Sequence, residues 1–469
     1  MSRYFAALVG AAAAVAALPG AGTAQGFAVN EHGSCAMGRA GTGVAMPCND
    51  GSGIWSNPAG IAGQKGFTLS GGLTIIDALG SFTDDLQGRK DDLDNDPIPV
   101  PHLYFVAGVT DKVSAGIGLF APYGLGTKWK TSFEGRFSGY DNSLQSIYIQ
   151  PTVAIQATDR IQVGVGFDFV VGFLELNQRA DLSEFTAAAN TTFGMLGIPF
   201  HTDFADANLD ANGATGAGAH FGVIVKASDA VTFGARYLTR VTLDYDGKAK
   251  FKPIATNIVL PPGNPLAIAL GLDPTTPLPL DAVLNQNNLF AAGAPLGTQG
   301  VKASITMPDQ ATVGVAFKAA PTLDLLFDLQ WINWSEFDAI TIDFENAVTP
   351  DRTLRENYDD TYAIRTGFEW AAKAGLAIRG GYLFHNGAAP DETVTPLLPE
   401  GSRNEVTLGV GFPITPKLSV SLAYQHIQQN DRRGRVREAP AGSVPTKALN
   451  SGLYEFSGNL FGTTFIWHF

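Results

Sequence analysis

An alternation of apolar with small or polar residues, repeating every second position, recurs along most of this chain and limits what it can fold into. In residues 163–169, Val and Phe alternate with Gly and Asp, and Phe461, Phe465, Trp467 and Phe469 share one face of the final segment. Successive side chains of a β-strand point to opposite faces, so this pattern is typical of strands. The sequence therefore predicts an all-β fold.

The composition indicates where the two faces point. Only 16% of the residues are charged, whereas about 25% is usual in soluble proteins, and the chain contains 54 glycines. The small and polar face therefore carries too few charges for a water-exposed surface. It is better suited to the lumen of a membrane-spanning antiparallel barrel whose apolar face meets lipid. The formal net charge of -13 argues against a nucleic-acid partner.

The first residues have the features of a signal for export. Arg3 precedes an apolar run over 5–18, which is followed by Pro19-Gly20 and by small residues ending at Ala24. This is the order of a secretory signal peptide, and the run is too short for a membrane-spanning helix. We expect residues 1–24 to be removed.

Fourteen segments carry the strand pattern, and an even number suits a closed barrel. They are 67–76, 102–110, 113–121, 145–157, 161–174, 217–227, 230–251, 300–317, 322–334, 361–371, 375–384, 403–412, 417–427 and 457–469. Short turns between them alternate with the long connections 77–101, 122–144, 175–216, 252–299, 335–360, 385–402 and 428–456. Outer-membrane barrels place their long loops outside the cell, and the alternation of short and long connections fits that arrangement. We therefore assign the strand segments and their connections, residues 67–469, to the barrel.

Residues 25–66 remain outside the strand pattern and are rich in Gly, Ala and Asn. A barrel of this size encloses more space than its wall side chains can fill. We expect this segment to plug the lumen.

Several short motifs of the mature chain resemble those of one family. They are Gly26-Phe27, Asn30-Glu31, Gly38-Arg39-Ala40, Gly43, Ser56-Asn57-Pro58-Ala59-Gly60, Leu329-Gln330-Trp331 with Trp334, Tyr358-Asp359-Asp360-Thr361-Tyr362 and the terminal Phe469. This pattern resembles the FadL family of outer-membrane transporters for long-chain fatty acids and other hydrophobic compounds. The resemblance implies a fourteen-stranded barrel plugged by an N-terminal hatch. It also implies a route from an outer apolar groove, through an internal pocket, to a lateral opening at a kink in the third strand.

The two longest outer loops supply candidate residues for the groove. These are Leu182, Phe185, Phe193, Met195, Leu196 and Ile198 in one loop, and Ile258, Leu260, Leu266, Ile268 and Leu270 in the other. Exposed apolar patches of this size mark binding sites. The alternative is that the two loops pack only on each other.

The third strand runs into Ala121-Pro122-Tyr123-Gly124, which is the candidate opening. Pro122 has no N–H to complete a ladder, and Gly124 tolerates unusual dihedral angles. The alternative is that the strand ends at Ala121. The resemblance favours the kink and places Asn57-Pro58-Ala59 beside it. Phe27, Asn30 and Glu31 complete the predicted hatch and gate residues.

Four further side chains are singled out by charge or by chemistry. Arg365 and Arg379 are the candidates for contact with a carboxylate cargo, although lumenal charges of this kind also pair with one another. Cys35 and Cys48 are candidates for a disulfide in the oxidising periplasm, and two free buried thiols are the alternative.

The function expected from these features is passive uptake of hydrophobic molecules across the bacterial outer membrane. The chain lacks Gly-x-Ser-x-Gly and His-Glu-x-x-His, so we expect no enzyme activity, cofactor or metal. A general aqueous porin and an outer-membrane lipid hydrolase are the alternatives. The expected partners are the cargo, outer-membrane lipid with lipopolysaccharide, and the barrel assembly machinery acting on Phe469. We expect a monomer.

Overall fold

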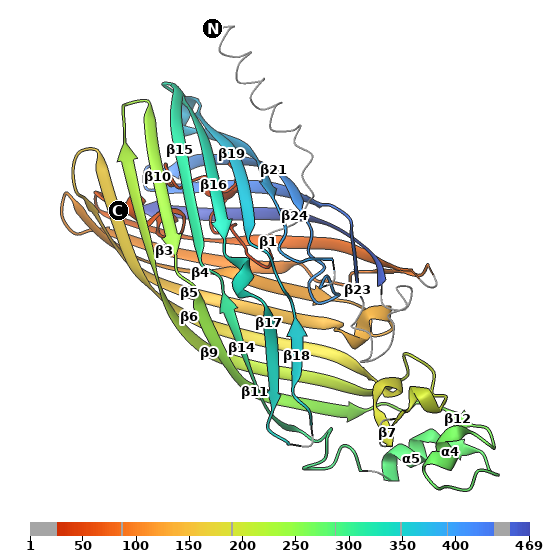
Figure 1. Cartoon of the computed structure of the whole chain (residues 1–469). Coiled ribbons are helices and arrows are strands. Elements are labelled where there is room, and N and C mark those ends of the chain that lie inside the picture. Colours follow the sequence, from red (N-terminus) through yellow and green to blue (C-terminus); the bar gives the residue numbers. More distant parts are fainter. Residues whose placement is uncertain are drawn as a thin grey trace.

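A closed antiparallel barrel with fourteen strand positions makes up most of the chain (Figure 1). The computed structural model describes residues 26–85, 88–188, 191–286, 288–347, 349–391, 393–435 and 451–469. The signal peptide predicted for 1–24 lies outside the described residues. The barrel closes where its first strand pairs with its last, from Thr68 opposite His468 to Asp84 opposite Gly452.

Several wall positions are long, and four of them consist of two consecutive segments. In order round the barrel they are β1 (Phe67–Asp84), β3 (Ile98–Gly108), β4 (Val113–Lys128), β5 (Asp141–Gln156), β6 (Ile161–Asp181), β9 (Asp203–Lys226), β10 (Val231–Leu238) with β11 (Val241–Pro253), β15 (Gln310–Ala320) with β14 (Gln299–Met307), β16 (Leu323–Ile332) with β17 (Ala339–Phe344), β19 (Thr361–Ala371) with β18 (Arg352–Arg355), β20 (Ala377–His385), β21 (Arg403–Thr415), β22 (Leu418–Gln429) and β24 (Ser451–His468).

Short elements lie in the loops and inside the barrel. The strands are β2 (Lys90–Asp92), β7 (Thr186–Ala188), β8 (Thr191–Thr192), β12 (Val259–Leu260), β13 (Leu278–Pro279) and β23 (Arg432–Arg435). The α-helices are α2 (Ser34–Met37), α3 (Gly53–Ser56), α4 (Pro265–Ala269) and α5 (Leu280–Gln286). The 3-10 helices are η1 (Pro58–Ile61), η2 (Glu134–Phe137), η3 (Leu182–Glu184), η4 (Gly194–Leu196), η5 (Trp334–Glu336) and η6 (Lys373–Gly375). No described helix has the length and apolar character needed to cross a membrane.

The predicted barrel and its fourteen positions are confirmed, but several predicted boundaries are wrong. The segments 230–251 and 300–317 are each interrupted, the second beside Pro308, which cannot donate to a ladder. The strand predicted at 217–227 begins at Asp203, so the connection predicted as 175–216 is shorter. It was missed because Asp or Asn alternates with Ala or Leu over 205–212, which gives little apolar contrast.

The two faces of the wall exchange character along the barrel. Toward the short turns, large apolar side chains such as Phe167 and Phe461 are exposed outside, while Gln150 and Asp168 are buried inside. Toward the long loops the pattern reverses: in β11, Tyr245 is buried inside and the alternate residues are exposed Asp, Lys and Thr. The outer part of the barrel therefore encloses an apolar interior within a polar exterior. The predicted apolar exterior holds only for the other part.

Candidate functional site

Residues 26–66, named here the N-terminal segment, run through the barrel interior and bond to inward-facing wall residues. The carboxylate of Asp328 on β16 accepts the backbone N–H groups of Gly43 and Val44, at 2.9 and 3.1 Å. The N–H of Ser34 donates to Oγ1 of Thr464 on β24, at 3.0 Å. These contacts attach the segment to opposite parts of the wall.

Glycines of the wall let this segment approach the strands closely. A Cβ atom at Gly234 would overlap the carbonyl of Val44, and one at Gly222 would overlap the side chain of Asn57. A Cβ atom at Gly164 would overlap the backbone that joins Pro58 to Ala59. The many glycines on the inward face are therefore explained by backbone packed directly against the wall.

We expect Gly234→Val to unseat the N-terminal segment without opening the barrel wall. Overpacking of this kind costs about 1–3 kcal/mol, and the isopropyl group meets backbone that cannot move aside alone. Planar-bilayer recordings should then show intermittent conductance that the parent lacks. Gly458→Ala is the matched control, because a Cβ atom there makes only ordinary contacts. If both variants stay silent, the close packing does not hold the segment in place.

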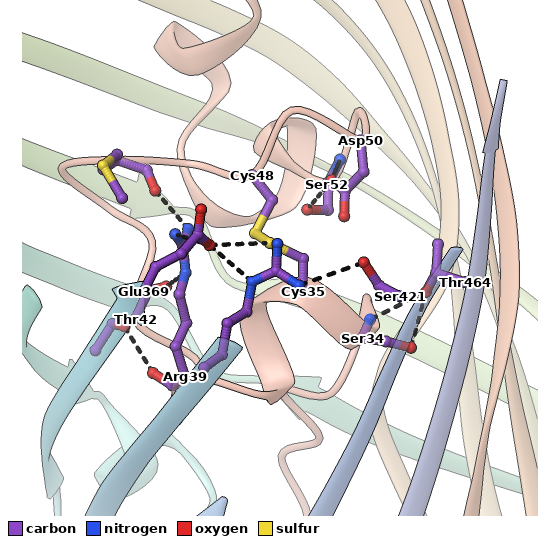
Figure 2. The surroundings of a disulfide bond; sticks show 12 residues. Ser34, Cys35, Arg39, Thr42, Cys48, Asp50, Ser52, Glu369, Ser421 and Thr464 are labelled. Carbon is purple, nitrogen blue, oxygen red and sulfur yellow. Dashed lines mark hydrogen bonds and ion pairs between the residues drawn. A yellow bond between two sulfur atoms is a disulfide. The ribbon is translucent and has the colours of Figure 1, made fainter. Parts of the chain in front are cut away.

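A disulfide and an ion-pair cluster secure the middle of the segment (Figure 2). Cys35 and Cys48 are joined, with sulfur atoms 1.98 Å apart, so they are not free thiols. Beside them, Nη1 of Arg39 lies 3.3 Å from Oε2 of Glu369. The same oxygen accepts a hydrogen bond from Nε of Arg379, at 2.7 Å. Closing a loop of this length removes about 3 kcal/mol of unfolded-state entropy on a chain-entropy model. The cross-link therefore favours one conformation of 35–48.

The start of the segment is bound from a different direction. The N–H of Gly26 donates to Oε1 of Glu400, at 2.7 Å, and the carboxylate also accepts the N–H groups of Ala388 and Ala389. Burial raises the pKa of Glu400, and these donors oppose the shift. Next along the chain, the ring centroid of Phe27 lies 4.7 Å from that of Trp334. These contacts hold Phe27 at one place in the lumen.

Two cavities meet at Phe27. The outer cavity has a volume of about 80 Å³ and is lined mainly by apolar side chains of β5, β6, β14 and β17. The inner cavity, of about 180 Å³, contacts residues 26–31 and also Ile98, Gly126 and Arg403. Phe27, Leu125 and Leu398 line both. A molecule moving from one cavity to the other passes these three side chains.

The inner cavity reaches a seam in the wall where β3 and β4 separate. Their ladder extends from Gly108 opposite Ser114 to Leu103 opposite Leu119, and in the described structure it does not continue to residues 98–102 of β3. The ladder from β4 to β5 skips Ala121 and Pro122, which form the kink. The predicted alternative is therefore wrong, because β4 does not end at Ala121 but continues to Lys128.

The N-terminal segment occupies the free edge of β4 at this kink. The N–H of Val29 donates to the carbonyl of Pro122 at 2.8 Å, and the N–H of Gly124 donates to the carbonyl of Phe27 at 3.0 Å. Ala28 forms an isolated bridge with Tyr123. Further along, Nδ2 of Asn95 donates to the carbonyl of Gly126 at 2.9 Å. The edge is thus paired by the segment and a loop instead of by β3.

Two prolines of β3 face the same seam and were not identified from the sequence. Gly108 donates its N–H to Gly66, which precedes β1, whereas Val109 donates to Val113 on β4. Backbone donors alternate between the two neighbours along a strand, so odd-numbered residues of β3 face β4. Pro99 and Pro101 therefore direct nitrogens without hydrogens toward the seam. Their spacing of two, just before the strand predicted at 102–110, was the available signal.

The predicted groove residues mostly pack together in the outer loops. Leu182, Phe193, Ile198, Leu260 and Leu266 are buried in one cluster, with Phe185, Leu196, Ile258 and Leu270 partly buried against it. Of the predicted residues, Met195 and Ile268 remain 72% and 64% exposed, and Val259, which was not among them, is 62% exposed. Partly buried Phe251 packs against both this cluster and the apolar lumen. The exposed apolar surface is therefore smaller than the eleven predicted residues imply. Phe251 connects the loop cluster beneath it with the apolar lumen.

Other predicted residues lie elsewhere than expected. Asn57 donates Nδ2 to carbonyls of Val44, Val223 and Ala235, so the Asn57-Pro58-Ala59 turn packs on β9, β10 and β6. The kink is occupied by residues 27–29 instead, because glycines at 164 and 222 give the turn its room. Arg365 contacts Gln330, and neither Arg365 nor Arg379 lines the outer or the inner cavity. Asn30 and Glu31 do line the inner one.

A barrel that holds its N-terminal segment in the lumen, with an apolar outer part and an unpaired seam, has the features of a transport protein of the bacterial outer membrane. A family model described as "Outer membrane protein transport protein (OMPP1/FadL/TodX)" matches residues 14–469. The chain belongs to this family, whose members are outer-membrane transporters and not enzymes. The predictions of outer-membrane location and of no enzyme activity are confirmed.

Individual relatives are similar over nearly the whole length. A "Long-chain fatty acid transport protein" of Salmonella typhi is 24% identical, with 98% of this chain and 97% of the relative covered. A structure of a Pseudomonas aeruginosa FadL homologue matches with a TM-score of 0.75 and 19% identity, covering 95% of this chain and 100% of that one. The P. putida toluene transporter TodX gives a TM-score of 0.68 and 18% identity over 94% and 99%. These structures share the fold.

Proposed function

We propose that this chain carries hydrophobic molecules across the outer membrane by passive diffusion. The observation that supports this most is the outer cavity, an apolar space inside a wall whose outer face is polar at the same level. Such a lumen solvates a hydrophobic molecule better than the surrounding water does. The relatives named for long-chain fatty acids and for toluene support the same class of cargo.

The proposed route begins at the exposed apolar side chains of the outer loops. Cargo adsorbs near Met195, Val259 and Ile268, then moves past Phe251 into the outer cavity. Displacement of Phe27 admits it to the inner cavity. Cargo leaves water for apolar surface at the first step and then moves by diffusion, so no energy source is required.

The proposed exit is lateral, through the seam between β3 and β4. Opening it requires release of the two backbone hydrogen bonds between residues 27–29 and β4. Pro99, Pro101 and Pro122 keep the two strands from pairing directly, so release of the segment leaves a gap. Cargo then enters the membrane instead of the periplasm. A general aqueous porin is a poorer interpretation, because the N-terminal segment fills the lumen.

The remaining partners are proposals of the same kind. We propose a monomer whose exterior meets lipid and lipopolysaccharide, with Phe469 as the signal for the barrel assembly machinery. Phe469 is exposed and bonds to the backbone of Phe67 at the short-turn end (Figure 1).

Blocking the outer cavity tests the proposed function. Ala303 lines this cavity, whereas its neighbour Ser304 is exposed on the opposite face. We expect Ala303→Trp to reduce uptake of a labelled hydrocarbon by at least about fivefold, because the indole fills a small, close-packed space. Ser304→Trp is the matched control and should transport normally. Equal uptake by both variants would contradict a route through this cavity.

A further inference from the structure

The two outer loops at the entrance carry no lysine or arginine. Residues 182–202 contain Glu184 and His201 as their only charged or titratable side chains, and residues 254–298 contain only Asp273 and Asp281. The His201 ring contacts the carboxylate of Glu134. The entrance therefore offers negative charge to an arriving molecule and no free cation from these loops.

The outer cavity continues this pattern. Among the described residues that line it there is no Lys, Arg or His, and the charged ones are Glu175 and Glu356. Arg352, the first residue of β18, lies farther out along the wall and does not line the cavity. Its Nη1 donates a hydrogen bond to Gln178, at 3.0 Å. Apart from these two glutamates, the polar lining side chains are the neutral hydroxyls of Ser143, Tyr358 and Thr395 and the amide of Asn142. A bound carboxylate would thus meet no counter-ion.

Among the described residues that line the inner cavity there is one arginine, Arg403, together with two glutamates. Arg403 shares this lining with Glu31 and Glu405. Nε2 of His385 lies 3.0 Å from Oε1 of Glu405, and Gln425 donates to Oε1 of Glu31 at 3.0 Å. A cargo carboxylate would have to compete with Glu405 for the positive charge of Arg403.

We infer that this chain selects hydrophobic molecules without an ionised group, such as hydrocarbons and esters, over ionised fatty acids. An ionised carboxylate moved from water into an apolar site without a partner loses several kcal/mol of solvation, and the lining carboxylates add repulsion. An ester of the same chain length loses little. The inference rests on the proposed function and names its substrate class.

A matched pair of ligands tests the selectivity. Hexadecanoic acid and its methyl ester have the same tail and differ in charge at pH 8. In equilibrium binding to the purified full-length barrel, we expect the ester to bind at least about tenfold more tightly. Equal or tighter binding of the acid would overturn the inference and leave the proposed function standing. Binding of neither ligand would overturn both.

A second experiment places a cationic side chain in the outer cavity. Leu174 lines the outer cavity on β6, four residues before Gln178, the partner of Arg352. We expect Leu174→Lys to raise the ratio of hexadecanoate affinity to ester affinity about tenfold relative to Leu174→Met. Heat-modifiable migration on gels verifies that both variants are folded barrels. An unchanged affinity for the acid in the lysine variant would contradict the absence of a counter-ion as the cause.

Discussion

Deleting residues 26–60 should turn a closed barrel into a conducting pore. Fourteen strands enclose a lumen that wall side chains alone do not fill, and the N-terminal segment is packed against wall glycines across it. Without it, buried Asp328 loses its backbone donors from Gly43 and Val44, and Glu369 loses Arg39 and keeps only Arg379 among the ion-pair partners described above. We expect ionic conductance in planar bilayers to rise by at least about tenfold.

The deletion leaves the ladders of the wall intact, because the segment contributes only an isolated bridge to them. Far-UV circular dichroism and heat-modifiable migration should therefore match the parent. The intact protein, refolded and reconstituted in the same way, is the control. A folded deletion variant with the parent's low conductance would contradict the assignment of residues 26–60 as a plug.

The alternation of residues predicted the barrel because each strand near the short turns separates lipid-facing from lumen-facing side chains. It was a weaker guide toward the outer loops, where the polarity of the two faces reverses and Asp or Asn alternates with Ala. That part of β9 was consequently predicted as a loop. The reversal matters for the proposed function, because it places the apolar outer cavity inside the part of the wall whose outer face is polar.

The site was less predictable than the wall. Pro122 marked the kink, but the partner that completes the edge of β4 is residues 27–29, far away in the sequence. No local pattern contains such a contact. The position of the Asn57-Pro58-Ala59 turn likewise depends on glycines of two separate strands and on a carbonyl of a third. The loops presented eleven apolar candidates, and packing among them decided which stayed exposed.

Restoring donors along the seam should stop transport while leaving binding intact. The triple variant Pro99→Val, Pro101→Val, Pro122→Val supplies three N–H groups and strand-favouring side chains where β3 and β4 now fail to pair. None of the three prolines lines the outer or the inner cavity. We expect the affinity for a labelled hydrocarbon to stay within about twofold and its uptake to fall at least about tenfold.

Pro413→Val provides the matched control, because Pro413 also adjoins a register shift in the wall but lies on β21, away from the seam. The most direct measurement is therefore the uptake rate of one labelled hydrocarbon by the parent, the triple variant and Pro413→Val, at equal amounts of folded barrel. Lateral release predicts normal rates for the parent and Pro413→Val and a loss confined to the triple variant. Parental uptake by a triple variant that binds normally would contradict it, since cargo would then pass the N-terminal segment into the periplasm.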